Sequence, residues 1–440
     1  MDKIISRPNL IPFILITSCF ALWGFANDIT NPMVAAFEKI FLTGATEATL
    51  VQLAFYGGYG VMAFPAALFI RKYTYKSGIM LGLGLYALGG LMFVPANAIG
   101  EFYPFLLAYF VITCGLSFLE TSANPYVLSM GSPHTATRRL NLAQAFNPMG
   151  SLTGMFVASN FILANLDSKD KAARMELTAA EFEAVKTHDL DVVSYPYILI
   201  SLVILTVLVL IAIHKMPANR EEDHNRAVDL GSIFTRLLGN RKYVLGVIAQ
   251  TFYVGAQIMC WTFIIYYGTE VFTAGGMGER DAQVLSQQYN IAAMVIFGVS
   301  RFVCTFLLGY IRPGRLLMIL AAGGIALTLG TIFIGGIYGL YCLVGISACM
   351  SLMFPTIYGI ALDGISGDDA KIAAAGLIMA IVGGTFLPLL QARIIDGWAF
   401  DFLSGPRASF VLPLLCFMVI SFYGYKVYII NNQLLKNESS

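Results

Sequence analysis

The stretch VSYPYILISLVILTVLVLIAIH, residues 193–214, decides the fold class, because it contains no Asp, Glu, Lys or Arg. A helix that crosses the hydrocarbon core of a bilayer needs about 20 mainly apolar residues, which is the length of this run. A basic, polar segment follows at 215–242, and another apolar run begins directly after it at 243–269. The sequence therefore predicts a membrane-spanning helix on each side of a polar linker.

Apolar runs of this kind recur along the whole chain. Of its 440 residues, 58% are hydrophobic and only 12% are charged, whereas soluble domains average about 25% charged residues. Twelve runs are long enough to span a membrane: 11–36, 48–70, 77–97, 103–130, 140–164, 193–214, 243–269, 285–309, 314–337, 339–363, 371–396 and 408–430. We expect an all-α polytopic membrane protein with twelve transmembrane helices in two six-helix halves, 1–214 and 243–440, joined by a cytoplasmic linker, 215–242.

A weak internal repeat supports the two halves. FIRKYTYKSGIMLGL (69–83) follows the second predicted helix, and GYIRPGRLLMILAA (309–322) follows the eighth. Both segments place a basic turn before a Gly-containing apolar run. Parallel repeats of six helices are the organisation of the major facilitator fold, which is therefore the architecture that we expect.

Basic residues fall unequally on the two sides of the predicted helices. Eighteen of the 27 Lys and Arg residues lie in the loops on the side of the two termini, and eight lie in the opposite loops. Cytoplasmic loops carry an excess of Lys and Arg. We therefore expect a multi-pass protein with both termini in the cytoplasm, as an even number of spans also requires.

Several classes of function are disfavoured. The net charge of +1 does not suit a nucleic-acid partner. The seven cysteines lie singly in apolar stretches and the four histidines lie in or beside polar segments, so neither a disulfide framework nor a metal site is expected. The chain lacks the G-x-x-x-x-G-K-[ST], H-E-x-x-H and G-x-S-x-G motifs. We expect neither enzymatic activity nor a cofactor, and we expect the protein to be surrounded by membrane lipid.

Three charged residues lie well inside predicted spans: Asp28, Glu120 and Arg301. Charges in a membrane interior are costly, and carboxyl groups there often form proton relays. Glu120 and Asn124 are one helical turn apart and share a face. Glu120 is thus either a proton-coupling residue or a hydrogen-bonded link between helices. The partner of Arg301, a carboxylate or a carbonyl, does not follow from the sequence.

Amide side chains form a stripe in the fifth predicted span. Asn141, Gln144 and Asn147 lie at positions i, i+3 and i+6, which a continuous helix would place on one inward face. Amides both donate and accept hydrogen bonds, so they match sugar hydroxyls better than they match ions or lipids. Hydrogen bonds between helices are the other interpretation.

The seventh predicted span carries a second polar face, with 3–4 spacing: Gln250, Tyr253, Gln257 and Trp261. Aromatic rings can stack on the apolar face of a sugar while amides bind its hydroxyls. Tyr266 and Tyr267 lie nearer the end of this span, where we expect interface anchors.

Prolines interrupt several spans, in ANPY (123–126), FNPMG (146–150) and FPTIYG (354–359) among others. Broken helices are common around transporter sites. A plain packing kink is the alternative, since neighbouring side chains can satisfy the carbonyl that a proline frees.

Five motifs carry a resemblance to a known family: FALWGFAND (20–28), LETSANPYV (119–127), RLNLAQAFNPMG (139–150), YVGAQIMCWTF (253–263) and FPTIYGIALDGI (354–365). The sequence resembles the fucose–galactose–glucose:proton symporter family of the major facilitator superfamily. The resemblance implies a monomeric transporter in the bacterial inner membrane that imports a neutral hexose or deoxyhexose, L-fucose first of all, with a proton and by alternating access.

The resemblance also implies roles for single residues. The glutamate of the family's LETxANP motif, here Glu120, is a proton and substrate residue, and Gln144 and Asn147 match cavity amides. The family's first helix resembles W-G-x-x-N-x-L-N-D, but here Asn31 occupies the position of the aspartate, and Asp28 lies three residues earlier. Residues three apart share a helix face, displaced by about 4.5 Å along the axis. Our hypothesis is that Asp28 replaces that aspartate.

Proton coupling is thus predicted for Glu120 and Asp28. The predicted substrate-binding residues are Asn27, Asn31, Asn124, Gln144, Asn147, Tyr253, Gln257 and Trp261. The alternatives are a glucose/galactose or other neutral-sugar carrier, proton-coupled or facilitative, and, from another class, a non-transporting membrane sensor. A sensor is expected to carry a signalling domain, whereas the residues after about 430 form only a short polar tail.

Overall fold

The computed structural model describes residues 4–5, 7–30, 33–43, 50–169, 171–216, 230–397 and 404–438. Every regular element among them is a helix, and 11 helical stretches in this part of the chain are long and apolar enough to cross a membrane. The all-α polytopic fold is thereby confirmed. Contacts group the chain into two units. The N-terminal unit holds residues 5–130 and 146–226, and the C-terminal unit holds 1–4, 131–145 and 227–440.

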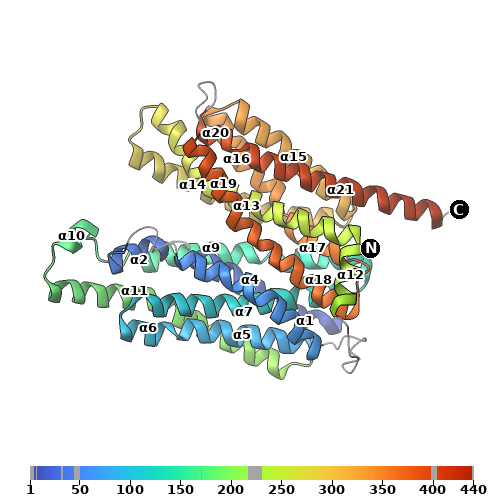
Figure 1. Ribbon diagram of the computed structural model, residues 1–440, viewed down its shortest axis with the longest axis horizontal. Helices are drawn as coiled ribbons and strands as arrows, with labels where there is room; N and C mark the ends of the chain where they lie inside the picture. The colour runs from blue at the N-terminus through green and yellow to red at the C-terminus, as the bar shows by residue number, and fades with distance from the viewer. Residues whose placement is uncertain are drawn as a thin grey trace. The chain divides into compact units, whose positions relative to one another are not determined.

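The N-terminal unit contains η1 (Arg7–Asn9), α1 (Leu10–Thr30), α2 (Met33–Phe41), α4 (Leu50–Lys72), α5 (Tyr75–Leu91), α6 (Phe93–Ile99), α7 (Phe102–Ser129), α9 (Asn147–Val157), η3 (Ala158–Leu163), α10 (Lys171–Met175) and α11 (Ala179–Ile213). Helix α7 packs against α4 and α5, and α1 packs against α9 (Figure 1). Glycines permit this close packing, as they do in membrane helices generally. A Cβ on Gly82 would lie 2.8 Å from the carbonyl oxygen of Gly115, and one on Gly115 would lie 2.5 Å from that of Gly82.

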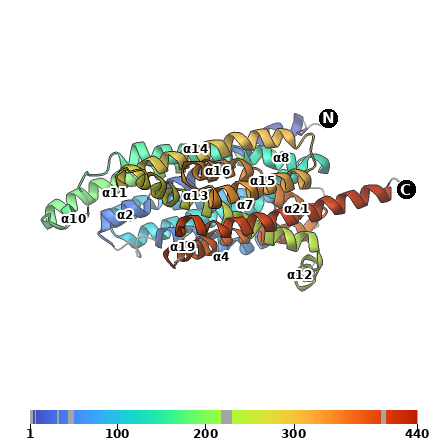
Figure 2. The ribbon, with the colours of Figure 1, turned by 90° about the horizontal axis from the view of Figure 1, so that it is seen from above.

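The C-terminal unit contains η2 (Pro133–Thr135), α8 (Ala136–Gln144), α12 (Leu230–Gly239), α13 (Arg241–Ala274), α14 (Glu279–Leu307), α15 (Pro313–Phe333), α16 (Gly336–Met350), α17 (Met353–Leu362), α18 (Gly367–Met379), η4 (Ala380–Val382), α19 (Gly383–Gly397), α20 (Gly405–Ser409) and α21 (Val411–Glu438). Helix α13 contacts α14, α16, α19 and α21, and α15 packs along α21 (Figure 2). Buried Tyr253, Phe263, Phe297 and Phe417 belong to one apolar core.

Helix α8 belongs to the C-terminal unit although it precedes the linker in sequence. It packs against α17 and α14, and a Cβ on Gly359 of α17 would lie 2.9 Å from the hydroxyl oxygen of Thr137. The division of the chain into halves 1–214 and 243–440 stays a prediction. Of the predicted linker, residues 217–229 lie outside the described residues.

The predicted single helix at 140–164 is wrong. Helix α8 ends at Gln144, α9 begins at Asn147, and a π-helical segment, η3, completes the span. Pro148 causes the break, because proline has no N–H for the carbonyl four residues earlier and its ring clashes with that carbonyl. Pro355 interrupts the tenth predicted span in the same way, between the end of α16 and the start of α17.

The segment between the predicted spans 140–164 and 193–214 is partly helical, because α11 already begins at Ala179. A capping box starts this helix. The Thr178 hydroxyl accepts from the backbone N–H of Glu181 at 3.4 Å, and the Glu181 carboxylate accepts from that of Thr178 at 3.0 Å. Reciprocal capping of this kind satisfies two donors that have no partner inside the helix.

Candidate functional site

Glu120 lies in the interior of the N-terminal unit, in the middle of α7. Its side chain is 2% exposed, and neither carboxyl oxygen has a hydrogen-bond partner of standard geometry among the described residues. The phenol of Tyr59, on α4, lies beside this carboxyl group and also beside the indole of Trp23. A buried carboxyl group without a strong donor is costly when ionised, so this environment favours a group that gains and loses a proton.

Asp28 lies on α1 in the same unit and is 8% exposed. Tyr56, one helical turn before Tyr59, lies near the Asp28 carboxyl group. Two neighbouring tyrosines of α4 therefore lie near the two acidic residues that the sequence analysis identified. The motif FYGGYG (55–60) contains this pair at positions i and i+3. Sequence reasoning missed both tyrosines, although a polar pair at helical spacing inside an apolar span was a usable signal.

The predicted amides of the N-terminal unit have different environments. Asn147 begins α9, and its Nδ2 donates to the carbonyl oxygen of Phe20 on α1 at 3.2 Å. The Nδ2 of Asn124 is buried and donates to the carbonyl oxygen of Glu120 at 3.0 Å, within α7. Asn27 is half-buried on α1. Asn31 lies outside the described residues.

Asn141, Gln144 and Asn147 do not lie on one continuous helix, because α8 ends at Gln144 and α9 begins at Asn147. Asn141 and Gln144 are in α8, in the C-terminal unit, whereas Asn147 begins α9. The Nδ2 of Asn141 donates to the Thr356 hydroxyl at 3.1 Å, which is a hydrogen bond between helices. Gln144 is 1% exposed.

The predicted face on α13 is largely held in place by α16. The Tyr253 hydroxyl is buried and donates to the carbonyl oxygen of Met350 at 3.2 Å. The indole N–H of Trp261 donates to the Ser347 hydroxyl at 3.2 Å. Gln257 lies between the two rings along the helix and is half-buried. Helix α13 thus presents an amide beside two fixed aromatic rings, a combination that suits a sugar.

Arg301, on α14, is 3% exposed and is held by backbone carbonyls. Its Nε donates to the oxygen of Ser351 at 2.5 Å, and one terminal nitrogen donates to the oxygen of Gln144 at 2.9 Å. The guanidinium also lies 4.5 Å from the centre of the Phe297 ring. Of the two partners that the sequence left open, the structure has the carbonyl.

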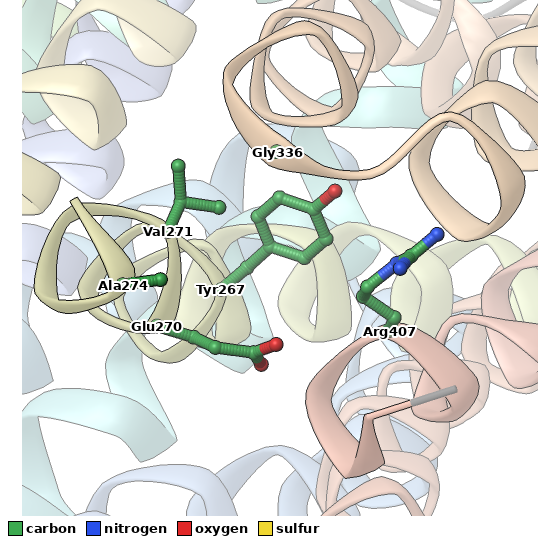
Figure 3. Close-up of a pocket in the computed structure, with 6 residues that line it drawn as sticks. All are labelled: Tyr267, Glu270, Val271, Ala274, Gly336 and Arg407. Carbon is green, nitrogen blue, oxygen red and sulfur yellow. The ribbon is translucent and has the colours of Figure 1, made fainter. Parts of the chain in front are cut away.

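A small pocket of about 140 Å³ lies at the far end of α13, lined by Tyr267, Glu270, Val271, Ala274, Gly336 and Arg407 (Figure 3). Glu270 and Arg407 line it from α13 and α20. Arg407 donates to the carbonyl oxygens of Ile332 and Phe333, and the Tyr267 hydroxyl donates to that of Thr331. Tyr267 is therefore a buried packing residue, and only Tyr266 is exposed as an interface anchor would be.

A buried ion pair orders the segment before α11. Arg174 and Asp189 are both fully buried and lie 2.5 Å apart. The second oxygen of Asp189 accepts from the backbone N–H of Asp167 at 2.8 Å. The backbone N–H of Lys169 donates to the Asp167 carboxylate at 2.9 Å and is the main reason that the pKa of this carboxyl group is lowered.

Comparison with known proteins identifies the superfamily. The family model of the Major Facilitator Superfamily matches residues 16–388. The chain belongs to this superfamily. As the fold and the absence of enzyme motifs led us to expect, this member is a transporter and not an enzyme.

Three relatives of this transporter stand out. It is 51% identical to the L-fucose-proton symporter of Haemophilus influenzae, over 97% of this chain and 98% of the relative. It is 31% identical to the glucose/galactose transporter of Brucella abortus, over 93% and 92% respectively. A crystal structure of the Escherichia coli fucose:proton symporter superposes with a TM-score of 0.86 at 33% identity, covering 96% of this chain and 99% of the other. The family expected from the five motifs is thereby confirmed.

Proposed function

We propose that this transporter imports L-fucose together with a proton by alternating access. The relative with 51% identity is an L-fucose-proton symporter, and the transporter contains the carboxyl groups and amides that such an activity needs. The single observation that carries the proposal is the environment of Glu120. This carboxyl group is buried in a membrane helix, beside a phenol, and no described residue donates a hydrogen bond of standard geometry to it.

Within this proposal, Glu120 takes up the coupled proton. Ionisation in a membrane interior is costly. Glu120 therefore exchanges its proton more readily when the substrate-free transporter is open to water. Asp28 acts as the second acidic residue from α1, in place of the aspartate that the family has at position 31. The neighbouring tyrosines, Tyr56 and Tyr59, are polar groups through which each carboxyl group can be hydrogen-bonded after deprotonation.

The sugar contacts are proposed on two sets of residues. Amides supply donors and acceptors for the hydroxyls: Asn27, Asn31, Asn124, Gln144, Asn147 and Gln257. Two aromatic rings supply the apolar surface, namely Tyr253 and Trp261. Because the Tyr253 hydroxyl already donates to Met350, we assign to this residue ring contact rather than a hydrogen bond to the sugar.

The topology belongs to the proposal as well. The excess of Lys and Arg in the loops next to the termini supports cytoplasmic termini, in a bacterial inner membrane. We further propose that the protein acts as a monomer built of two six-helix halves joined by the linker at 215–242.

A glucose or galactose carrier is the second candidate. The relative from Brucella abortus supports it at 31% identity. The amide and aromatic groups fit any neutral hexose, because they bind hydroxyls and an apolar sugar face in the same manner.

Uptake into proteoliposomes tests the proposal. Radiolabelled L-fucose is supplied under an inward proton gradient, with and without a protonophore, to the wild type and to Glu120→Gln. We expect accumulation in the wild type that collapses with the gradient and is absent from Glu120→Gln. Competition with unlabelled glucose and galactose separates the two candidates. Gradient-independent equilibration in the wild type would contradict proton coupling.

A further inference from the structure

The two carbonyl oxygens that Arg301 binds have a common origin. In an α-helix, the N–H of a residue donates to the carbonyl oxygen four residues earlier. The donor for Gln144 would be residue 148, and the donor for Ser351 would be residue 355. Both positions are prolines, which have no N–H. Pro148 and Pro355 thus leave two carbonyl groups without their helical donors, and the same guanidinium binds both.

Burial makes these two contacts energetically important. Gln144 is 1% exposed, Ser351 is fully buried and Arg301 is 3% exposed, so water does not replace a lost donor there. In a membrane helix a freed carbonyl has to be satisfied by a neighbouring group. Arginine suits this task, because its planar fork presents several donors in fixed directions and its charge strengthens each hydrogen bond.

Arg301 also contacts Phe297, which packs against Trp261 of the proposed sugar site. Its guanidinium lies over the Phe297 ring at 4.5 Å, and the Phe297 ring packs edge-on against Trp261 at 5.0 Å with an interplanar angle of 84°. The indole N–H of Trp261 is fixed by Ser347 at 3.2 Å. One side chain therefore connects the break after α8, the break before α17, and the aromatic ring proposed to stack on the sugar.

We propose that Arg301 is a positioning residue that replaces the two backbone donors removed by Pro148 and Pro355, and so holds Gln144 and Trp261 in the geometry that binds the sugar. The part that concerns the sugar rests on the proposed function. The replacement of the donors does not, because it follows from the proline positions and the two hydrogen bonds. The guanidinium remains charged throughout, so this role differs from that of a proton carrier.

A mutant cycle tests the proposal, because alanine at 148 and 355 restores the missing N–H groups. L-Fucose binding is measured by isothermal titration calorimetry on the purified full-length protein. In the natural background we expect Arg301→Met to weaken binding about tenfold or more, the loss that an unpaired buried polar group causes. In the Pro148→Ala/Pro355→Ala background the same change is expected to weaken binding less than about threefold. The same factor in both backgrounds would overturn the proposal.

Two further variants distinguish positioning from charge. Arg301→Lys keeps the charge but lacks the fork, so we expect it to bind L-fucose more weakly than the wild type and more tightly than Arg301→Met. Arg236→Met removes an exposed arginine paired with Asp369 and is the matched control, expected to leave binding unchanged. Wild-type affinity in Arg301→Lys would overturn the part of the proposal that concerns geometry.

A second readout does not require any sugar. Cys304 is 5% exposed, lies one turn after Arg301, and its sulfur accepts from the Ser351 hydroxyl at 3.7 Å. With every other cysteine replaced by alanine, we expect Arg301→Met to raise the rate of Cys304 alkylation about tenfold. We expect no such rise in the Pro148→Ala/Pro355→Ala background.

The two readouts separate the proposals from each other. If the wild type binds no L-fucose, the proposed function fails, and the alkylation rates still decide the role of Arg301. An equal rise in both backgrounds, or no rise in either, would overturn that role. If the Arg301→Met protein cannot be recovered from membranes, we expect it to be recovered once Pro148→Ala and Pro355→Ala are added. Failure to recover that triple variant would overturn the proposal.

Discussion

Glu120 and Arg301 are both buried charged side chains in membrane helices, but their surroundings are opposite. Arg301 donates to two carbonyl oxygens and lies over an aromatic ring. Glu120 has a phenol beside it and no hydrogen bond of standard geometry from the described residues. A buried charge that has hydrogen-bond partners stays charged, whereas a buried carboxyl group without them is costly to ionise and releases its proton only where water or a donor reaches it. This contrast is the basis on which we propose positioning for Arg301 and proton transfer for Glu120.

The largest expected effect comes from removing the charge of Glu120 while keeping its size. Glu120→Gln is expected to lower proton-driven L-fucose accumulation by roughly 100-fold or more, because no proton can be carried at that position. Exchange of labelled for unlabelled sugar across the membrane, which needs no net proton movement, is expected to continue. Glu183→Gln, an exposed glutamate of α11 with a 62% exposed side chain, is the control and should accumulate normally. Full accumulation in Glu120→Gln would contradict the proposal that Glu120 carries the coupled proton.

The buried ion pair of Arg174 and Asp189 extends the comparison, because the Asp189 carboxylate, unlike that of Glu120, has a charged partner. Asp189→Asn leaves a fully buried guanidinium without its counterion, and such a loss costs about 3 kcal/mol or more. We expect a clear fall in thermal unfolding temperature with little change in the affinity for sugar. An unchanged unfolding temperature would mean that this pair contributes nothing. The partly exposed Lys186–Glu183 pair provides a reference, and its removal should lower the free energy of unfolding by less than about 1 kcal/mol.

Tyr59 tests whether the phenol next to Glu120 matters for proton transfer. Tyr59→Phe removes the hydroxyl and keeps the ring, so packing in α4 is preserved. We expect proton-driven uptake to slow about tenfold, the range typical of losing a hydrogen bond to a charged group. Uptake rates of Tyr59→Phe and Tyr56→Phe are compared under the same gradient. A normal rate in both variants would show that the carboxyl groups work without these phenols.

The smallest expected effect concerns Asp167, outside the membrane-spanning helices. The pKa of its carboxyl group is lowered in the folded protein. Asp167 therefore stabilises the fold above its unfolded pKa, and this contribution is lost as the pH falls through the folded pKa. We expect Asp167→Asn to unfold at a slightly lower temperature near neutral pH, and the difference to vanish in acid. Unfolding scans between about pH 6 and pH 3 measure it, and a difference that grows in acid would contradict the assignment.

Much of the fold could be predicted because apolar length alone identifies spans. The break inside 140–164 could not, since Pro148 permits either a bend or a full interruption, and packing against α1 decides between them. A Cβ on Gly150 would lie 1.8 Å from the carbonyl oxygen of Ala21, which indicates how closely α9 approaches that helix. No local pattern encodes such a contact.

The site was predicted in part for a similar reason. Glu120 and Arg301 were recognisable because a charge in an apolar run is conspicuous. The partners of Arg301 were not, since Gln144 and Ser351 are far from it in sequence and meet it only through packing. The tyrosines of α4 escaped notice because tyrosine in a membrane helix is equally typical of an interface anchor.

The most direct test of the central assignment is the pH dependence of L-fucose binding, measured at equilibrium on the purified wild type and on Glu120→Gln. If Glu120 carries the coupled proton, wild-type affinity falls as the pH rises and the carboxyl group ionises, whereas the affinity of Glu120→Gln stays constant over the same range. A pH dependence in Glu120→Gln equal to that of the wild type would place the coupled proton on another group.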